Sequence, residues 1–173
     1  MTRAARLDLR SFQQGLAARL AARTTAQVEA SRLALDCAGT RWLVRLADAG
    51  EVIAVPPIAR VPLTRDWFLG LANIRGNLYT VVDFAAFVGS APVPASPAAR
   101  LLLLNAHSGD LNAGLVVERV TGLRNLAELA EHAAPPGAPD WYVQRWSDAD
   151  GNTSQEIDLV ALARDPAFLQ VGT

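Results

Sequence analysis

The side chains that could carry out chemistry are few, and their spacing does not form an active site. Cys37 is the single cysteine, and a nucleophilic thiol needs a nearby base. The two histidines, His107 and His132, fall in predicted loops or at helix edges, and the pattern Gly-x-Ser-x-Gly is absent. The neighbours of Cys37 instead indicate a small core side chain at the end of a strand. We therefore expect a protein that is not an enzyme.

One run, residues 148–152 (Asp-Ala-Asp-Gly-Asn), has the acidic and amide side chains of a calcium loop. An EF-hand loop is longer, ends in a bidentate glutamate and lies between helices, and none of this is found here. Asp, Gly and Asn are also favoured in tight turns, so a hairpin turn is the better interpretation. One cysteine and two histidines cannot complete a closed four-ligand zinc site. We expect no metal and no cofactor.

The segment over residues 70–84 is the most informative part of the chain. It reads as two strands joined by a tight turn at Gly76-Asn77, where glycine supplies a positive φ. Arg75 is the charged side chain at the edge of this turn, and its guanidinium can donate two hydrogen bonds to a carboxylate. That carboxylate belongs either to a partner protein or to this chain. In the second case Arg75 is a strut for the turn, paired with Asp83 or Glu51.

The side chains around Arg75 also have expected roles. Asn73 and Gly76 shape the turn, and Asp83, at the end of a strand, binds a neighbouring backbone amide. Trp67 is either a core residue or an exposed aromatic of the kind that dominates interfaces. The candidate protein-binding residues are therefore Arg75, Asn73, Gly76, Asn77 and Trp67.

Composition limits the other functions. The chain has 173 residues, 51% of them hydrophobic, and a net charge of −1. A nucleic-acid-binding small β-barrel is the alternative hypothesis, but balanced charge and only 6% aromatic residues disfavour it. A single cysteine excludes an intrachain disulfide, and no apolar run reaches the roughly 18 residues of a membrane span. We expect a cytoplasmic protein that binds no nucleic acid and does not insert into a membrane.

The pattern of apolar residues predicts a mainly β protein with a helix at each end. The spacing of Leu9, Phe12, Leu16 and Leu20 predicts a helix over residues 8–30, which packs on its own domain or contacts a partner. A short helix near 159–170, interrupted by Pro166, ends the chain. Alternating segments and turn signals predict strands, besides the hairpin, at 32–37, 41–46, 51–55, 100–106, 111–120, 141–146 and 154–159, with a short helix or bend at 123–132.

Three motifs in sequence resemble the CheW-like adaptors of bacterial chemosensory systems. Residues 73–76 (Asn-Ile-Arg-Gly), followed by 81–84 (Val-Val-Asp-Phe), are similar to the family's Asn-Leu-Arg-Gly turn and the strand after it. Residues 114–120 (Gly-Leu-Val-Val-Glu-Arg-Val) are similar to a second family segment, with Glu118 where aspartate is usual. The segment before the turn, which includes Trp67, also matches. The N-terminal extension and the sequence of residues 61–67 look most like those of the PilI-type adaptors of type IV pilus systems.

The resemblance implies a fold and a function. The fold would be two small five-stranded SH3-like barrels on a shared core, with a helical extension at 1–30 and the CheW-like domain at 31–171. Its subdomains would span about 31–88 and 100–160, joined by a proline-rich crossing loop at 89–99. Asp83, Val116, Val117 and Glu118 would be structural residues of the motifs. The protein would be a non-enzymatic scaffold that couples a methyl-accepting chemoreceptor's cytoplasmic tip to a CheA-type histidine kinase in twitching motility, in membrane-associated receptor arrays.

Overall fold

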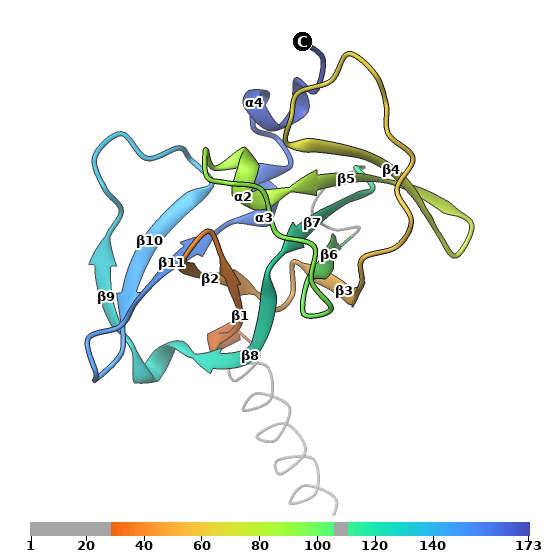
Figure 1. Cartoon of the computed structure of the whole chain (residues 1–173). Coiled ribbons are helices and arrows are strands. Elements are labelled where there is room, and N and C mark those ends of the chain that lie inside the picture. Colours follow the sequence, from red (N-terminus) through yellow and green to blue (C-terminus); the bar gives the residue numbers. More distant parts are fainter. Residues whose placement is uncertain (1–28, 106–110) are drawn as a thin grey trace, which may run out of the picture.

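A computed structural model describes residues 29–105 and 111–173, which form short strands and shorter helices (Figure 1). The helix expected over residues 8–30 lies almost entirely outside the described residues. The strands are β1 (Ser31–Cys37), β2 (Thr40–Arg45), β3 (Ala49–Ala54), β4 (Phe68–Ile74), β5 (Asn77–Asp83), β6 (Arg100–Leu104), β7 (Ala113–Val117), β8 (Arg119–Asn125), β9 (Ala130–Ala133), β10 (Tyr142–Ser147) and β11 (Thr153–Ile157). The helices are α2 (Phe84–Phe87), η2 (Leu126–Glu128), α3 (Leu159–Leu162) and α4 (Pro166–Leu169).

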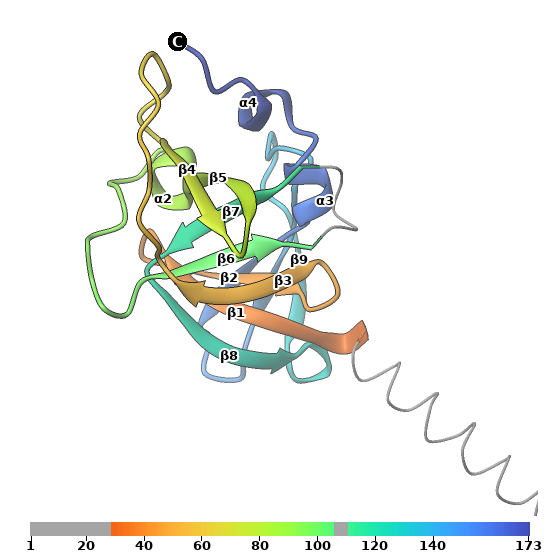
Figure 2. The same cartoon turned by 90° about the vertical axis from the view of Figure 1, so that its right-hand side faces the viewer.

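The strands form two mixed sheets, which face each other in Figure 2. One sheet has six strands in the order β8-β1-β2-β11-β10-β9, and the other has five in the order β3-β6-β7-β5-β4. The expected five strands are therefore found in one sheet only. The outermost strands of each sheet do not pair with each other in the described residues, so closed SH3-like barrels are not what the pairing shows. The sixth strand arises because residues 119–133 supply both β8 and β9, at opposite edges.

Each sheet takes strands from both sides of the loop at 89–99. Strands β1 and β2 pair with β8 and β11, and β11 lies parallel to β2 with Ser154 opposite Arg41. Strands β3 and β5 pair with β6 and β7, and β5 lies parallel to β7. The hydrogen-bonded sheets therefore do not coincide with the two sequence segments expected as subdomains.

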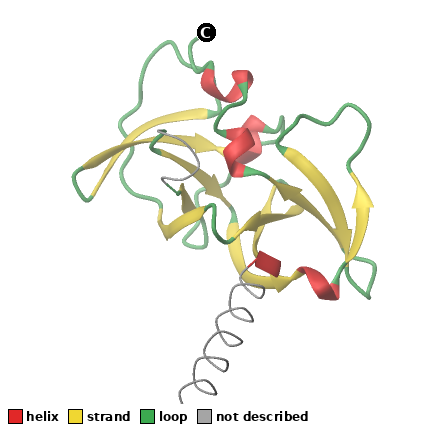
Figure 3. Ribbon diagram, turned by 180° about the vertical axis from the view of Figure 1, so that it is seen from behind, coloured by secondary structure: helices red, strands yellow, loops and turns green. Residues whose placement is uncertain are grey.

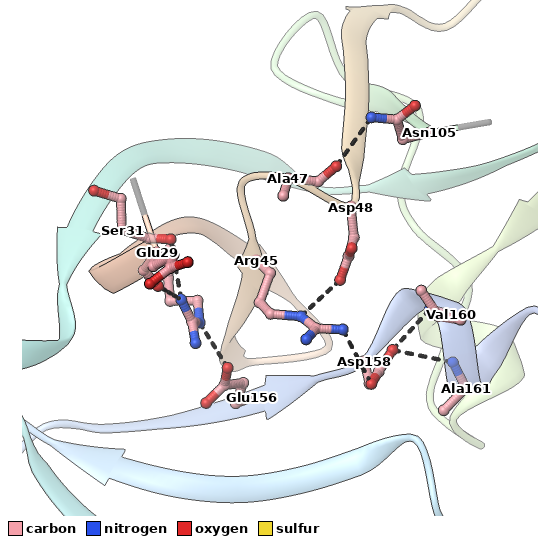
Figure 4. A network of polar contacts seen from close by, with 11 residues as sticks. Glu29, Ser31, Arg45, Ala47, Asp48, Asn105, Glu156, Asp158, Val160 and Ala161 are labelled. Atoms are coloured by element: carbon pink, nitrogen blue, oxygen red, sulfur yellow. Dashed lines mark hydrogen bonds and ion pairs between the residues drawn. The ribbon is translucent and has the colours of Figure 1, made fainter. Parts of the chain in front are cut away.

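Polar contacts hold the place where the chain crosses from one sheet to the other (Figure 4). Arg45, at the end of β2, donates through Nε to Asp48 at 2.7 Å and through Nη2 to Asp158 at 3.2 Å. Asp158 in turn caps α3 by accepting from two backbone amides. Asn105, after β6, donates to the carbonyl oxygen of Ala47 at 2.9 Å. The turn at residues 46–48, between β2 and β3, is thus fixed to both sheets.

The core lies between the sheets, and each sheet has a further apolar cluster on its other face. Neighbouring residues of β5 divide between them, since Val82 belongs to the shared core and Val81 to the second cluster of its own sheet. Both are at most 2% exposed. The second half of β5 is therefore covered on both faces, as its apolar residues on both sides require, whereas Leu78 near the turn is 58% exposed.

The helix or bend expected at residues 123–132 is wrong for most of its length. Strand β8 continues to Asn125, only η2 is helical, and β9 follows. Gly122, with φ of +112°, coincides with a register shift against β1, which lets the strand continue past the predicted break. Leu126 and Leu129 recur at helical spacing for another reason, because both pack against the outer cluster of the six-stranded sheet.

The C-terminal helix is interrupted at Pro166, as predicted, and becomes two single-turn helices (Figure 3, red). Asp158 caps α3 and Asp165 caps α4, and each carboxylate accepts from two backbone amides. Pro166 begins α4 in the first turn, where a missing N–H costs nothing.

Candidate protein-binding site at the β4–β5 hairpin

The β4–β5 hairpin projects from the body of the molecule, at the right of Figure 1. Its two-residue turn is Arg75-Gly76, with φ of +53° and +86°, because Ile74 ends β4 and pairs with Asn77 at the start of β5. The predicted turn, Gly76-Asn77, is therefore wrong by one residue. Two positive φ values are what the tightest hairpin turns require, and an arginine in this conformation is unusual.

Asn73 shapes the turn, as predicted. Its side-chain oxygen accepts a hydrogen bond from the backbone N–H of Gly76 at 2.9 Å. Asn77 is exposed and belongs to the strand. The backbone of the tip is thus fixed locally, without contribution from the side chain of Arg75.

The guanidinium of Arg75 pairs with Glu51 and not with Asp83. Its Nη2 donates to Oε1 of Glu51 at 2.7 Å, and the two side chains are 74% and 43% exposed. A pair this exposed is worth about 0–1 kcal/mol. Nε and Nη1 of Arg75 have no hydrogen bond to the part of the chain that the structure describes. The contact and strut interpretations of Arg75 are therefore compatible with each other.

Glu51 reaches the hairpin because of an irregularity in β3. The register of β3 against β6 shifts between Ala49 and Val52, so Glu51 lies within a bulge. Bulges redirect side chains, and Glu51 is exposed here. The neighbouring Gly50 has no room for a Cβ, which would lie 2.8 Å from the carbonyl oxygen of Leu103.

Asp83 binds backbone amides, as predicted. It is 2% exposed and accepts from the N–H of Ala86 at 3.0 Å and the N–H of Val93 at 2.8 Å. The first bond caps α2, and the second fixes the proline-rich loop. Asp83 therefore supports the base of the hairpin and is too buried to meet a partner.

Gly70 fixes the outer edge of β4. Its φ is +133°, and a Cβ there would lie 2.1 Å from the carbonyl oxygen of Ala59. Ala59 and Leu71 exchange two backbone hydrogen bonds, of 2.8 and 2.9 Å. Only glycine allows the loop before β4 to approach so closely, and the hairpin is held at its base by this contact.

Trp67 lies at the other end of β4 from the turn. It is half-buried, stacks on Phe168 with ring centroids 6.2 Å apart and meets Phe87 edge-on at 5.2 Å. A strand of seven residues spans roughly 20 Å, so Trp67 and Arg75 do not belong to one small contact patch. The structure brings Asn73, Arg75, Gly76 and Asn77 together and leaves Trp67 apart.

The second motif is structural. Val116 and Val117 are buried on opposite faces of β7. Glu118 accepts a hydrogen bond from the backbone N–H of Ala38 at 2.9 Å, which ties the end of β7 to the β1–β2 turn. The side chain of Glu118 is long enough to reach that turn.

Sequence reasoning missed a buried ion pair. Arg32 and Glu156 are 9% and 4% exposed, and Nε of Arg32 donates to Oε1 of Glu156 at 2.6 Å. Trp146 Nε1 donates to Oε2 of Glu156 at 2.7 Å. The available signal was Trp146, because a buried indole N–H needs an acceptor.

Among residues 29–105 and 111–173, the reactive side chains are not assembled into a site. Cys37 is fully buried, and burial raises the pKa of its thiol to about 12. His132 lies on β9, with three strands between it and β1, and hydrogen-bonds to Ser147; His107 lies outside the described residues. Asp148 accepts from Asn152 and from two backbone amides, and the hydrogen bond from the Asn152 side chain is the largest cause of its lowered pKa. The 148–152 run is thus a self-contained turn.

No three His, Cys, Asp or Glu side chains among residues 29–105 and 111–173 are grouped as a metal site would need. The helices in the same two ranges are all too short or too polar to span a bilayer.

Comparisons with known proteins agree with the architecture. The chain is 32% identical to Protein PilI of Pseudomonas aeruginosa over 111 residues, which are 62% of this chain and 61% of PilI, so it spans less than two thirds of that relative. Its structure is similar to the scaffolding protein TtCheW from Thermoanaerobacter tengcongensis, with a TM-score of 0.64 at 18% identity over 75% of this chain and 88% of that one. The model of the CheW-like domain matches residues 33–167, and the chain therefore belongs to the CheW-like domain family.

Proposed function

We propose that this chain is a non-enzymatic adaptor of a chemosensory pathway. It couples the cytoplasmic tip of a methyl-accepting chemoreceptor to a CheA-type histidine kinase, in membrane-associated arrays on the cytoplasmic side. The likeness to PilI supports a pathway that controls type IV pilus twitching motility. The family match and the absence of an assembled reactive site in the described residues support a function in binding.

The observation that carries this proposal is the exposed guanidinium of Arg75 on a rigid turn. The hairpin is fixed at its base by Asp83 and Gly70 and at its tip by Asn73, so little conformational freedom is lost when a partner binds. Nε and Nη1 of Arg75 make no hydrogen bond to the described residues, so each can donate to a carboxylate of the partner. The contact belongs to the small, reversible class of signalling interfaces.

The test measures binding of the kinase's regulatory domain and of a receptor tip fragment by calorimetry. Arg75→Glu is expected to weaken at least one of the two by tenfold or more, because it reverses the charge of the tip. Arg75→Gly removes the side chain but keeps a turn that glycine accepts, and Glu51→Gln removes the ion pair but keeps Arg75. Arg60→Glu, an exposed arginine in the loop before β4, is the matched control.

The three variants separate the two roles of Arg75. If Arg75 is a contact, Arg75→Gly loses binding and Glu51→Gln retains it. If it is a strut, both weaken binding to a similar extent. Unchanged binding of both partners by a folded Arg75→Glu protein would remove the hairpin from the proposed interface. Normal twitching in a strain that carries only this variant would contradict the pathway as well.

A further inference from the structure

The two faces of the β4–β5 hairpin are covered to different extents. Successive residues of a strand point to opposite faces, so Leu78 and Tyr79 lie on different sides of the hairpin. Tyr79 packs against the second cluster of the five-stranded sheet, whereas Val82, on the same face as Leu78, is buried in the core between the sheets. That core does not cover Leu78, which is 58% exposed. The core face of the hairpin therefore ends in an uncovered leucine.

Arg75 extends over the other face. Tyr79 and Ile53 of β3 pack against the same cluster, on one side of the sheet. The guanidinium of Arg75 meets Glu51, which also belongs to β3. The cation at the tip therefore lies on the side of the hairpin that carries Tyr79, and Leu78 lies on the opposite side.

Exposure alone does not make Leu78 a binding residue, because single exposed leucines are common on protein surfaces. Leu123 on β8, for example, is 56% exposed. Leu78 differs because it lies three residues after Arg75, whose φ of +53° strains the backbone at the tip, and such strain is concentrated at functional sites. Arg75 is also the only charged side chain in residues 68–82. A partner of the hairpin therefore meets one cation on a neutral, partly apolar projection.

Glu51 limits the charge that a partner can bring to the Arg75 side. Its side chain is 43% exposed, and its Oε1 lies 2.7 Å from Nη2 of Arg75. A strongly acidic partner surface would be repelled by this carboxylate. A single carboxylate can instead accept from Nε and Nη1 of Arg75, which make no hydrogen bond to the described residues. The Arg75 side therefore fits one acidic group and not an acidic patch.

We propose that the partner of Arg75 receives the hairpin in a cleft with two different walls. One wall supplies a single carboxylate to Arg75, and the opposite wall supplies an apolar pocket that buries Leu78. A flat partner surface would cover one face of the hairpin and leave the other side chain in solvent. The hairpin projects from the body of the molecule, so both of its faces are accessible (Figure 1). This inference rests on the proposed function, because it describes the partner of the same hairpin.

The test measures affinity by calorimetry with the fragment, receptor tip or kinase regulatory domain, whose binding Arg75→Glu weakens. Leu78→Thr removes most of the apolar surface but keeps a side chain that favours strands. It should weaken binding at least tenfold, because the burial of a leucine is lost. Leu78→Ile keeps the apolar surface and should bind nearly as well as the native chain. Leu123→Thr, at an equally exposed leucine of the other sheet, is the matched control and should change nothing.

The outcomes separate this inference from the proposed function. If Arg75→Glu weakens binding and Leu78→Thr does not, the partner covers one face only, which overturns the cleft and leaves the adaptor function standing. A loss confined to the other fragment, or an equal loss from Leu123→Thr, also overturns the cleft. If Arg75→Glu weakens neither fragment, the hairpin is not the interface and both proposals fail.

A labelling experiment tests the apolar wall without the threonine variant. Cys37 is fully buried, and burial raises the pKa of its thiol to about 12, so it should not react with iodoacetamide in the folded protein. Leu78→Cys introduces an accessible thiol, and a saturating amount of the fragment should slow its alkylation at least tenfold. Alkylation of Leu123→Cys should be unchanged. A thiol at residue 78 that stays fully reactive in the complex overturns the cleft.

Discussion

Two arginine–glutamate ion pairs in this protein have nearly equal N–O distances, but one is buried and the other is exposed to solvent. Arg32 and Glu156 meet at 2.6 Å with side chains 11% and 5% exposed, whereas Arg75 and Glu51 meet at 2.7 Å with side chains 74% and 43% exposed. The first pair is shielded from solvent, so water cannot easily hydrate a side chain that loses its partner. The second pair is open to solvent, so water can. Equal geometry therefore supports opposite roles, since breaking the first leaves a buried charge and breaking the second leaves a hydrated one.

The difference also separates architecture from recognition. The buried pair joins β1 to β11, which are 124 residues apart in sequence, and its carboxylate also accepts from Trp146. The exposed pair joins β3, one edge strand of the five-stranded sheet, to the projecting turn between β4 and β5 at its other edge. Under the proposed function, a partner competes for Arg75 without disturbing the fold, whereas competition for the buried Arg32 would disturb it.

The largest effect on stability is expected from Glu156→Ala. We expect the free energy of unfolding to fall by about 3–5 kcal/mol, because Arg32 keeps a buried charge without its partner and Trp146 loses its acceptor. Urea denaturation measures the change. Replacing both partners (Arg32→Met with Glu156→Leu) should cost clearly less than Glu156→Ala. A single variant of nearly native stability would show that water reaches the pair.

The second prediction concerns burial of a single ionisable group, Cys37. Burial raises the pKa of its thiol from an ordinary value of 9.0 to about 12. Between these pH values the unfolded chain loses the thiol proton and the folded protein keeps it. The free energy of unfolding is therefore unaffected by this thiol below pH 9, and it falls as the pH rises above 9, by up to about 1.4 kcal/mol per pH unit. Urea denaturation from pH 8 to pH 10.5 measures the slope.

Cys37→Ala is the control for this prediction. Tyr142 also has a raised pKa, because of burial, and adds to the alkaline loss in both proteins. The difference between the native chain and Cys37→Ala isolates the thiol. Parallel curves for the two proteins would mean that Cys37 ionises in the folded state as easily as in the unfolded one.

The third prediction tests the exposed pair itself. Glu51→Gln should lower the free energy of unfolding by no more than about 1 kcal/mol, because both side chains are hydrated. The loss should shrink further at 0.5 M salt, where exposed charges are screened. A loss as large as that of Glu156→Ala would remove the contrast between the two pairs.

The smallest effect is expected from Arg75→Gly. Glycine relieves the cost of a positive φ, roughly 1 kcal/mol, but makes the unfolded chain more flexible and removes the ion pair. These contributions oppose one another, so stability should change by about 0.5 kcal/mol or less. Thermal melting beside Arg75→Val, whose branched side chain tolerates this conformation poorly, provides the comparison. A large loss for glycine would give the arginine side chain a stabilising role that the exposed pair does not explain.

Much of the fold follows from local patterns in the sequence. Alternation at residues 32–37 and 41–46 predicts β1 and β2, and the hairpin at 70–84 is found with its turn one residue away. The error has a physical cause. Gly76 and Asn77 are both residue types that readily adopt a positive φ, which favours a turn at these two positions. In the protein Arg75 adopts a positive φ instead, and the side chain of Asn73 accepts a hydrogen bond from the backbone N–H of Gly76 that holds this turn.

The parts that sequence reasoning missed depend on distant residues. Arg32 and Glu156 look like solvated charges until the sheet order places them side by side. Leu126 and Leu129 have helical spacing, but their positions are set by the sheet below them. In the candidate site, the strut interpretation leaves Asp83 and Glu51 as partners for Arg75, and the bulge that favours Glu51 has no clear local signal in the sequence.

The parallel pairing of β2 with β11 has a consequence for synthesis of the chain. Residues 40–45 leave the ribosome long before residues 153–157, their neighbours in the six-stranded sheet. Until translation is nearly complete, β2 has an open edge and apolar side chains with no cover, a state in which nascent polypeptides aggregate or bind chaperones. A product cut short before β11 therefore cannot complete this sheet and is more exposed to aggregation and proteolysis than the intact chain.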